Sequence, residues 1–137
     1  PGIGFLLMRS QHHGAVVYGA SGTNYLDEGR IEGEDPLAPF GPNTAAHVKR
    51  TDGFTHCPDI VLNSTYWPET DEVAAFEELV GSHGGLGGTQ SYPFVLHPAD
   101  LQWPEDGIIG SEKIHYLFMD WLAELGQDQL ISNDSPG

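Results

Sequence analysis

The residues best suited to chemistry lie in residues 81–88, where His83 stands in a run of glycines. Gly84 and Gly85 follow His83 directly, and glycines there allow the backbone to turn sharply and approach another group. An imidazole on such a turn can present a ring nitrogen to a metal ion or a phosphate. The alternative is a flexible glycine loop that happens to contain a histidine. Since zinc takes three or four protein ligands, further ligands have to come from elsewhere in this chain or beyond it.

The other reactive residues form no known catalytic motif. The sequence contains no HExxH, CxxC or GxxxxGK[ST] motif, and no GxSxG nucleophile elbow. Cys57 and His56 are adjacent, but neighbours on a strand point to opposite faces, so Cys57 is interpreted as a small buried hydrophobe. Surface or structural roles are favoured for five other histidines: His12, His13, His47, His56 and His115. No catalytic residue is assigned in this chain.

Composition limits the classes of partner. The chain has 137 residues, with 20 Asp and Glu against five Lys and Arg, for a net charge of −15. This balance argues against binding a nucleic-acid backbone or an anionic membrane surface. A single cysteine excludes an intramolecular disulfide, and no apolar run reaches the roughly 18 residues that span a bilayer. Because the sequence begins at Pro1 and a strand-like segment follows at once, we interpret it as a processed or excised piece.

A strand is expected to position the chemistry at residues 58–64. Its continuously apolar centre is typical of a strand covered on both faces in a parallel sheet. Ligands in open α/β sheets gather beyond the carboxyl ends of strands. Asn63 and Ser64, at that end, are therefore candidate substrate-binding residues, although polar residues at a strand end can also be simple turn formers.

The remaining pattern predicts an α/β fold over residues 1–126, followed by a polar tail at 127–137. Strands at 3–8, 15–18 and 25–26 form an antiparallel meander in this prediction. Short helices are expected at 43–50 and 72–80. A final helix is expected at 111–126, where apolar residues recur with the spacing of one helix face. They are Ile114, Leu117, Phe118, Trp121, Leu122 and Leu125.

The segment FEELVGSHGGLGG at 76–88 resembles the last metal-binding segment of the alkaline phosphatase superfamily. In its type I phosphodiesterase/nucleotide pyrophosphatase-like branch, a G-[ST]-H-G turn supplies a histidine to a bimetal centre. A bacterial subgroup of phage-holin-linked membrane proteins is more similar still. Three more segments resemble its C-terminal region in the same order: PGIGFLL at 1–7, GEDPLAPFGP at 33–42 and DIVLNS at 59–64.

The resemblance implies a phosphoester hydrolase with two divalent metal ions, usually zinc, and a Thr or Ser nucleophile. Only His83 matches a family metal ligand. The nucleophile and the other ligands precede this region in the family, so the chain corresponds to the C-terminal part of an incomplete alkaline-phosphatase-like domain. We expect it to be inactive alone, to pack on the remainder of that domain, and to be membrane-associated only through a region absent here.

A second hypothesis is a non-catalytic acidic subunit or interaction module that packs on a larger partner. The position of His83 distinguishes the two. A His83 at the edge of an open cleft, beside the carboxyl end of the 58–64 strand, favours the hydrolase. A His83 sealed in the core favours the structural role.

Overall fold

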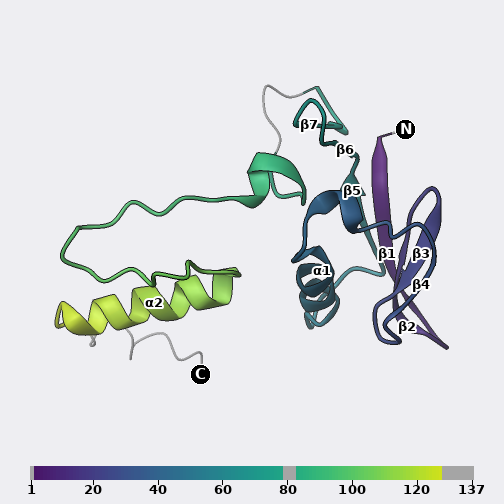
Figure 1. The fold of residues 1–137 in the computed structure, drawn as a ribbon. Helices are drawn as coiled ribbons and strands as arrows, with labels where there is room; N and C mark the ends of the chain where they lie inside the picture. The colour runs from purple at the N-terminus through teal and green to yellow at the C-terminus, as the bar shows by residue number, and fades with distance from the viewer. Residues whose placement is uncertain (1, 79–82, 128–137) are drawn as a thin grey trace. The chain divides into compact units, whose positions relative to one another are not determined.

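The structure, a computed structural model, describes residues 2–78 and 83–127 and is mixed α/β (Figure 1). Its internal contacts divide the chain into two compact units, Pro1–Phe94 and Val95–Gly137. Of the predicted polar tail at 127–137, only Gln127 lies within the described residues.

Five antiparallel strands form the sheet of the first unit, in the order β4-β3-β2-β1-β5. The strands are β1 (Ile3–Ser10), β2 (Gly14–Tyr18), β3 (Gly22–Tyr25), β4 (Arg30–Gly33) and β5 (Ile60–Ser64). The predicted antiparallel meander is confirmed, but its third strand lies at 22–25 and not at 25–26. It extends by one strand, because β4 pairs with β3 along its whole length.

The prediction that residues 58–64 form a parallel strand covered on both faces is wrong. β5 pairs antiparallel with β1 and occupies the edge of the sheet. Two of its apolar side chains, Ile60 and Leu62, are 54% and 49% exposed. Their alternation with Val61, which packs against the core, shows that only one face of β5 is covered by the described residues.

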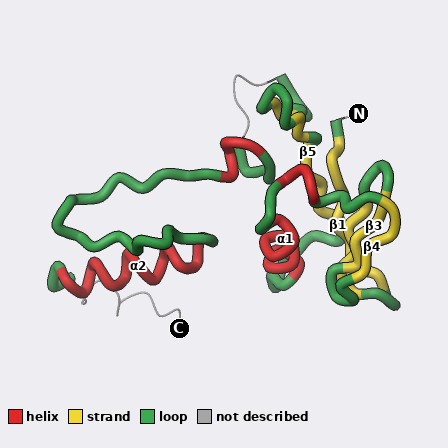
Figure 2. Tube along the Cα trace, in the orientation of Figure 1, coloured by secondary structure: helices red, strands yellow, loops and turns green. Residues whose placement is uncertain are grey.

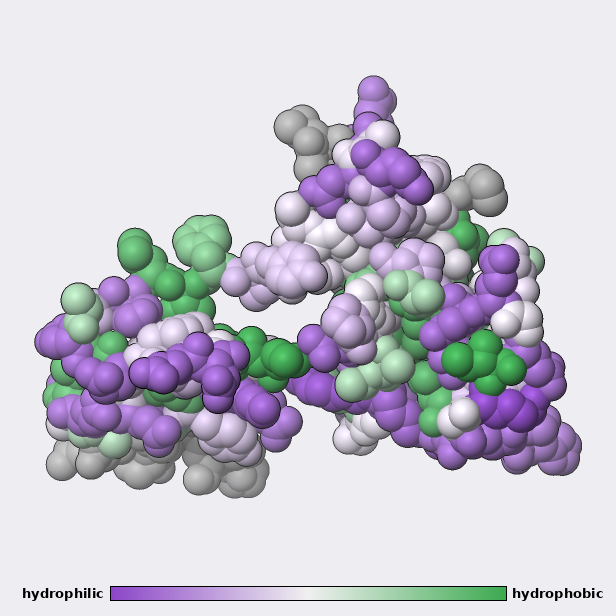
Figure 3. Space-filling view, in the orientation of Figure 1, coloured by the Kyte–Doolittle hydropathy of each residue, from purple (hydrophilic) through white to green (hydrophobic). Residues whose placement is uncertain are grey.

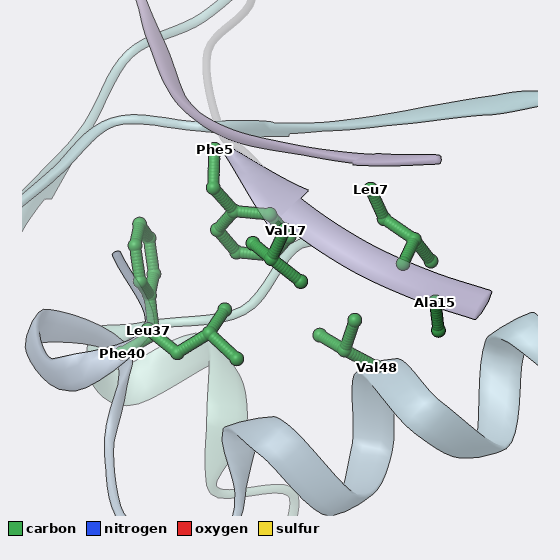
Figure 4. Packing of buried hydrophobic residues seen from close by; sticks show 7 residues of the cluster. All are labelled: Phe5, Leu7, Ala15, Val17, Leu37, Phe40 and Val48. Carbon is green, nitrogen blue, oxygen red and sulfur yellow. The ribbon is translucent and has the colours of Figure 1, made fainter. Parts of the chain in front are cut away.

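One sheet face carries the core, against which helix α1 (Thr44–Asp52) packs (Figure 4). Its buried members are Phe5, Leu7, Ala15, Val17, Leu37, Phe40 and Val48. The rings of Phe5 and Phe40 meet edge to face, with centroids 5.1 Å apart. The predicted helix at 43–50 is confirmed, and Lys49 and Arg50 stand in its last turn, where cations complement the helix dipole.

Ion pairs join α1 to the sheet. The buried carboxylate of Asp52 accepts a hydrogen bond from Arg9 of β1 at 2.5 Å, and Lys49 contacts both Asp52 and Asp27. Asp27 also accepts a hydrogen bond from the backbone amide of Ala15 at 3.0 Å. The Lys49 ammonium, and then the Ala15 amide, hold the pKa of the Asp27 carboxyl below its usual value.

A hairpin replaces part of the helix that was expected at 72–80. β6 (Tyr66–Trp67) pairs with β7 (Glu72–Val73), and Asp71 in the connection has a φ of 53°. The helix prediction is therefore wrong for residues 72–78, and residues 79 and 80 lie outside the described part. Two single-turn 3₁₀ helices, Ala38–Phe40 and Gly88–Ser91, complete this unit (Figure 2).

The second unit is organised around α2 (Ser111–Glu124), which confirms the predicted C-terminal helix. Trp121 is its one buried residue, and the indole N–H donates to the carbonyl of Gln102 at 3.1 Å. The ring centroid of His97 lies 5.4 Å from that of Trp103 and 5.1 Å from that of Trp121. Apolar side chains remain on the surface of both units, as the green atoms in Figure 3 show. No helix in the described part is long and apolar enough to cross a membrane.

Candidate functional site

His83 is exposed and lines an open hollow of about 720 Å³ in the first unit. Asn63 and Ser64, at the carboxyl end of β5, line the same hollow, as do Gly84 and Gly85. The structure thus brings together all five residues that the sequence singled out. The volume of the hollow lies in the range of small-molecule sites. The hydrolase hypothesis expects His83 at the edge of an open cleft, and the exposed His83 lies at such a place. The structural role expects a His83 that is sealed in the core.

Asn63 fastens the glycine-rich segment to the end of β5. Its side-chain oxygen accepts from the amide of Leu86 at 2.9 Å, and its side-chain nitrogen donates to the carbonyl of Leu86 at 3.3 Å. The same nitrogen donates to the carbonyl of Ser64 at 3.0 Å. Because Asn63 is only 7% exposed and its amide already bonds to Leu86 and Ser64, it has little capacity left for a substrate.

Glycines in this segment serve different needs. Gly84 has a φ of 82°, in the left-handed region that favours glycine, and a Cβ there would meet open space. Gly87 has a φ of 104°, and its Cβ would lie 2.9 Å from Phe40 and from Tyr66. A Cβ on Gly85 would make only ordinary contacts, the nearest at 3.4 Å from Asn63. Close packing of the loop on the core thus depends on Gly87, which the sequence analysis did not single out.

Tyr66 and Asp71 contact the end of the glycine-rich segment, at the 3₁₀ helix Gly88–Ser91. The Tyr66 hydroxyl donates to Asp71 Oδ1 at 3.2 Å, and the backbone amide of Thr89 donates to the same oxygen at 3.3 Å. Desolvation, and next the neighbouring Asp71 carboxylate, raise the pKa of Tyr66 above its usual value. The hydroxyl therefore stays protonated at neutral pH and serves as a donor.

Helix α1 contributes a wall of the hollow that sequence reasoning missed. His47, Arg50 and Thr51 of α1 line the hollow, as does Asn43 just before the helix, and the spacing of the three helix residues places them on one helix face. His47 was assigned a surface or structural role from the sequence. The sequence does show His47 one helix turn before Arg50 and Thr51. This spacing indicates a site only when the structure places His83 in the same hollow.

The described residues do not by themselves build a metal centre. Within residues 2–78 and 83–127, no three His, Cys, Asp or Glu side chains are grouped to hold a metal ion. The hollow contains His47, Glu77 and His83 as possible donors. A zinc ion at His83 would therefore need ligands from outside the described residues.

Comparison with known proteins finds no matching family model, no matching curated protein and no matching solved structure.

Proposed function

We propose that this chain is the C-terminal part of a metal-dependent phosphodiesterase or nucleotide pyrophosphatase-like hydrolase, to which it supplies one metal ligand, His83. The observation that carries the proposal is the exposed His83 at the edge of a hollow beside the carboxyl end of β5. The similarity of residues 76–88 to the metal-binding segment of the alkaline phosphatase superfamily supports it. Two divalent metal ions, zinc in most of that family, would polarise the phosphoester in the complete domain.

The sheet supports the incomplete-domain part of this proposal. Ile60 and Leu62 expose apolar surface on β5, and β5 pairs with β1 alone among the described strands. An edge strand with exposed apolar residues is a template for further pairing. The remainder of the parent domain would cover this edge and bring the missing ligands toward His83.

Reconstitution tests the proposed function. The purified chain with zinc and bis(p-nitrophenyl) phosphate should show no turnover. Co-expression with the preceding part of its parent protein should restore hydrolysis, and His83→Ala should remove it. Turnover by the chain alone, or full activity of the reconstituted His83→Ala protein, would contradict the proposal.

The second candidate is a non-catalytic module that packs on a larger partner. The exposed apolar side chains of β5 favour it, and they fit either hypothesis. The reconstitution experiment separates them, because a non-catalytic module would form the complex without a hydrolytic activity that depends on His83.

A further inference from the structure

The charges that line the hollow differ from those of the whole chain. The chain carries four acidic residues for every basic one, but the described lining has one carboxylate, Glu77, and one guanidinium, Arg50. Two imidazoles, His47 and His83, line it as well. A cavity with this balance attracts anions better than the surrounding surface does, because the local field depends on the nearest charges.

The positions of the basic residues sharpen this contrast. Arg9, Arg30 and Lys49 do not line the hollow, and Lys113 belongs to the second unit. Arg50 is thus the one Lys or Arg among the described residues that line the hollow. Its guanidinium lies over the ring of Phe54, 5.0 Å from the centroid, and guanidinium groups bind phosphate oxygens in a bidentate manner.

We propose that Arg50 and His47 of α1 form a phosphoryl-binding wall in this hollow. The spacing of one helix turn places both side chains on one face of α1. Phe5, Phe40 and Val61 provide an apolar floor, which strengthens electrostatic contacts above it by lowering the local dielectric. The ligand is an anionic phosphoester whose charged group meets Arg50 and whose organic part rests on the floor.

This inference rests on the proposed function for the identity of the substrate, but phosphate binding can be tested without a metal. Backbone amide NMR of the full 137-residue chain, titrated with inorganic phosphate and then with phenyl phosphate, reports the site. The expected result is a shift centred on residues 47–51 and 83–86, with tighter binding of phenyl phosphate. Arg50→Gln should weaken phosphate binding about tenfold, and Arg50→Lys should weaken it less.

Arg30→Gln is the matched control, because it removes one guanidinium from β4 and none from the hollow. It should bind phosphate as the wild type does. Equal binding by Arg50→Gln and wild type, or equal losses in Arg50→Gln and Arg30→Gln, would overturn the inference. Zinc titration of the chain reconstituted with the preceding part of its parent protein separates the two proposals: Arg50→Gln should retain the zinc response at His83, whereas His83→Ala should lose it even if phosphate binding fails.

Discussion

The side-chain amide of Asn63 hydrogen-bonds to both polar backbone groups of Leu86, accepting from the N–H at 2.9 Å and donating to the carbonyl at 3.3 Å. It thereby joins the last residues of β5 to the glycine-rich segment at Leu86, 23 positions further along the chain. The two hydrogen bonds resemble those between paired strands, except that the side-chain amide of Asn63 takes the place of a backbone amide and carbonyl. The position of the Leu86 backbone therefore depends on a residue that the sequence presented as a substrate contact.

Asn63→Ala should destabilise the first unit by about 1–3 kcal/mol, because the part-buried amide of Leu86 loses its hydrogen bond to Asn63, while the Leu86 carbonyl keeps only the bond from Gln90. The matched control is Asn43→Ala, which removes an exposed amide that makes no capping hydrogen bond at the start of α1. It should change stability by less than about 0.5 kcal/mol. Urea denaturation measures both, and equal effects would contradict the clamp.

Gly87→Ala should be far more damaging than Gly85→Ala. The new methyl group at position 87 would lie 2.9 Å from Phe40 and Tyr66, on a backbone with a φ of 104°. Overpacking and backbone strain of this kind cost about 1–3 kcal/mol each. At position 85 the methyl group has room. Thermal unfolding of the two variants compares them directly, and similar melting temperatures would show that the loop does not pack as described.

Acid should weaken the contact between α1 and the sheet. Since Lys49 and the Ala15 amide lower the pKa of Asp27 in the folded state, the contribution of this carboxylate is present above its unfolded pKa, near 4. It is lost as the pH falls through the lower folded value. Asp27→Asn should lower the free energy of unfolding at pH 7 by under about 1 kcal/mol, because the Lys49–Asp27 ion pair is partly exposed. It should also make stability fall less steeply as the pH is lowered.

Urea midpoints measured over a range of about five pH units, from roughly pH 2 to pH 7, check the Asp27 prediction. Glu34→Gln, which neutralises an exposed carboxylate, is the control and should leave the acid limb as steep as in the wild type. An Asp27→Asn profile parallel to the wild type over this range would argue against the ion pair.

The open edge of β5 predicts self-association of the isolated chain. Leu62→Lys places a charge on a side chain that is 49% exposed, so it should reduce association without loss of stability. Ile109→Lys, at a residue that is 56% exposed and lies outside the described strands, should have a smaller effect. Sedimentation velocity over a range of concentrations tests this, and a chain that is monomeric throughout would remove the support that β5 gives to an incomplete domain.

Local patterns predicted the elements better than their partners. The meander, α1 and α2 follow from apolar periodicity and turn residues, which are properties of short segments. The run of Ile60, Val61 and Leu62 was assigned to a strand correctly but to the wrong environment. Burial of such a run depends on what covers it, and Ile60 and Leu62 on the outer face of β5 are left about half exposed by the described residues.

The site shows the same division. Sequence reasoning found His83, and the structure places it with Asn63 in one hollow. It missed His47 and Arg50, because α1 and the His83 segment lie more than 30 positions apart and only the folded sheet brings them to one hollow. It also could not distinguish Asn63 as a clamp from Asn63 as a substrate ligand, since both roles use the same amide.

The most direct test of the central claim is a zinc titration of the chain co-expressed with the preceding part of its parent protein, followed by NMR of the histidine rings. The account predicts that His83 responds first, that the amides of Gly84 and Gly85 shift with it, and that His83→Ala removes this response. His13→Ala, which alters an exposed imidazole paired with Glu28, should leave it unchanged. A first response centred on another histidine, or one that survives in His83→Ala, would contradict the assignment of His83 as a metal ligand.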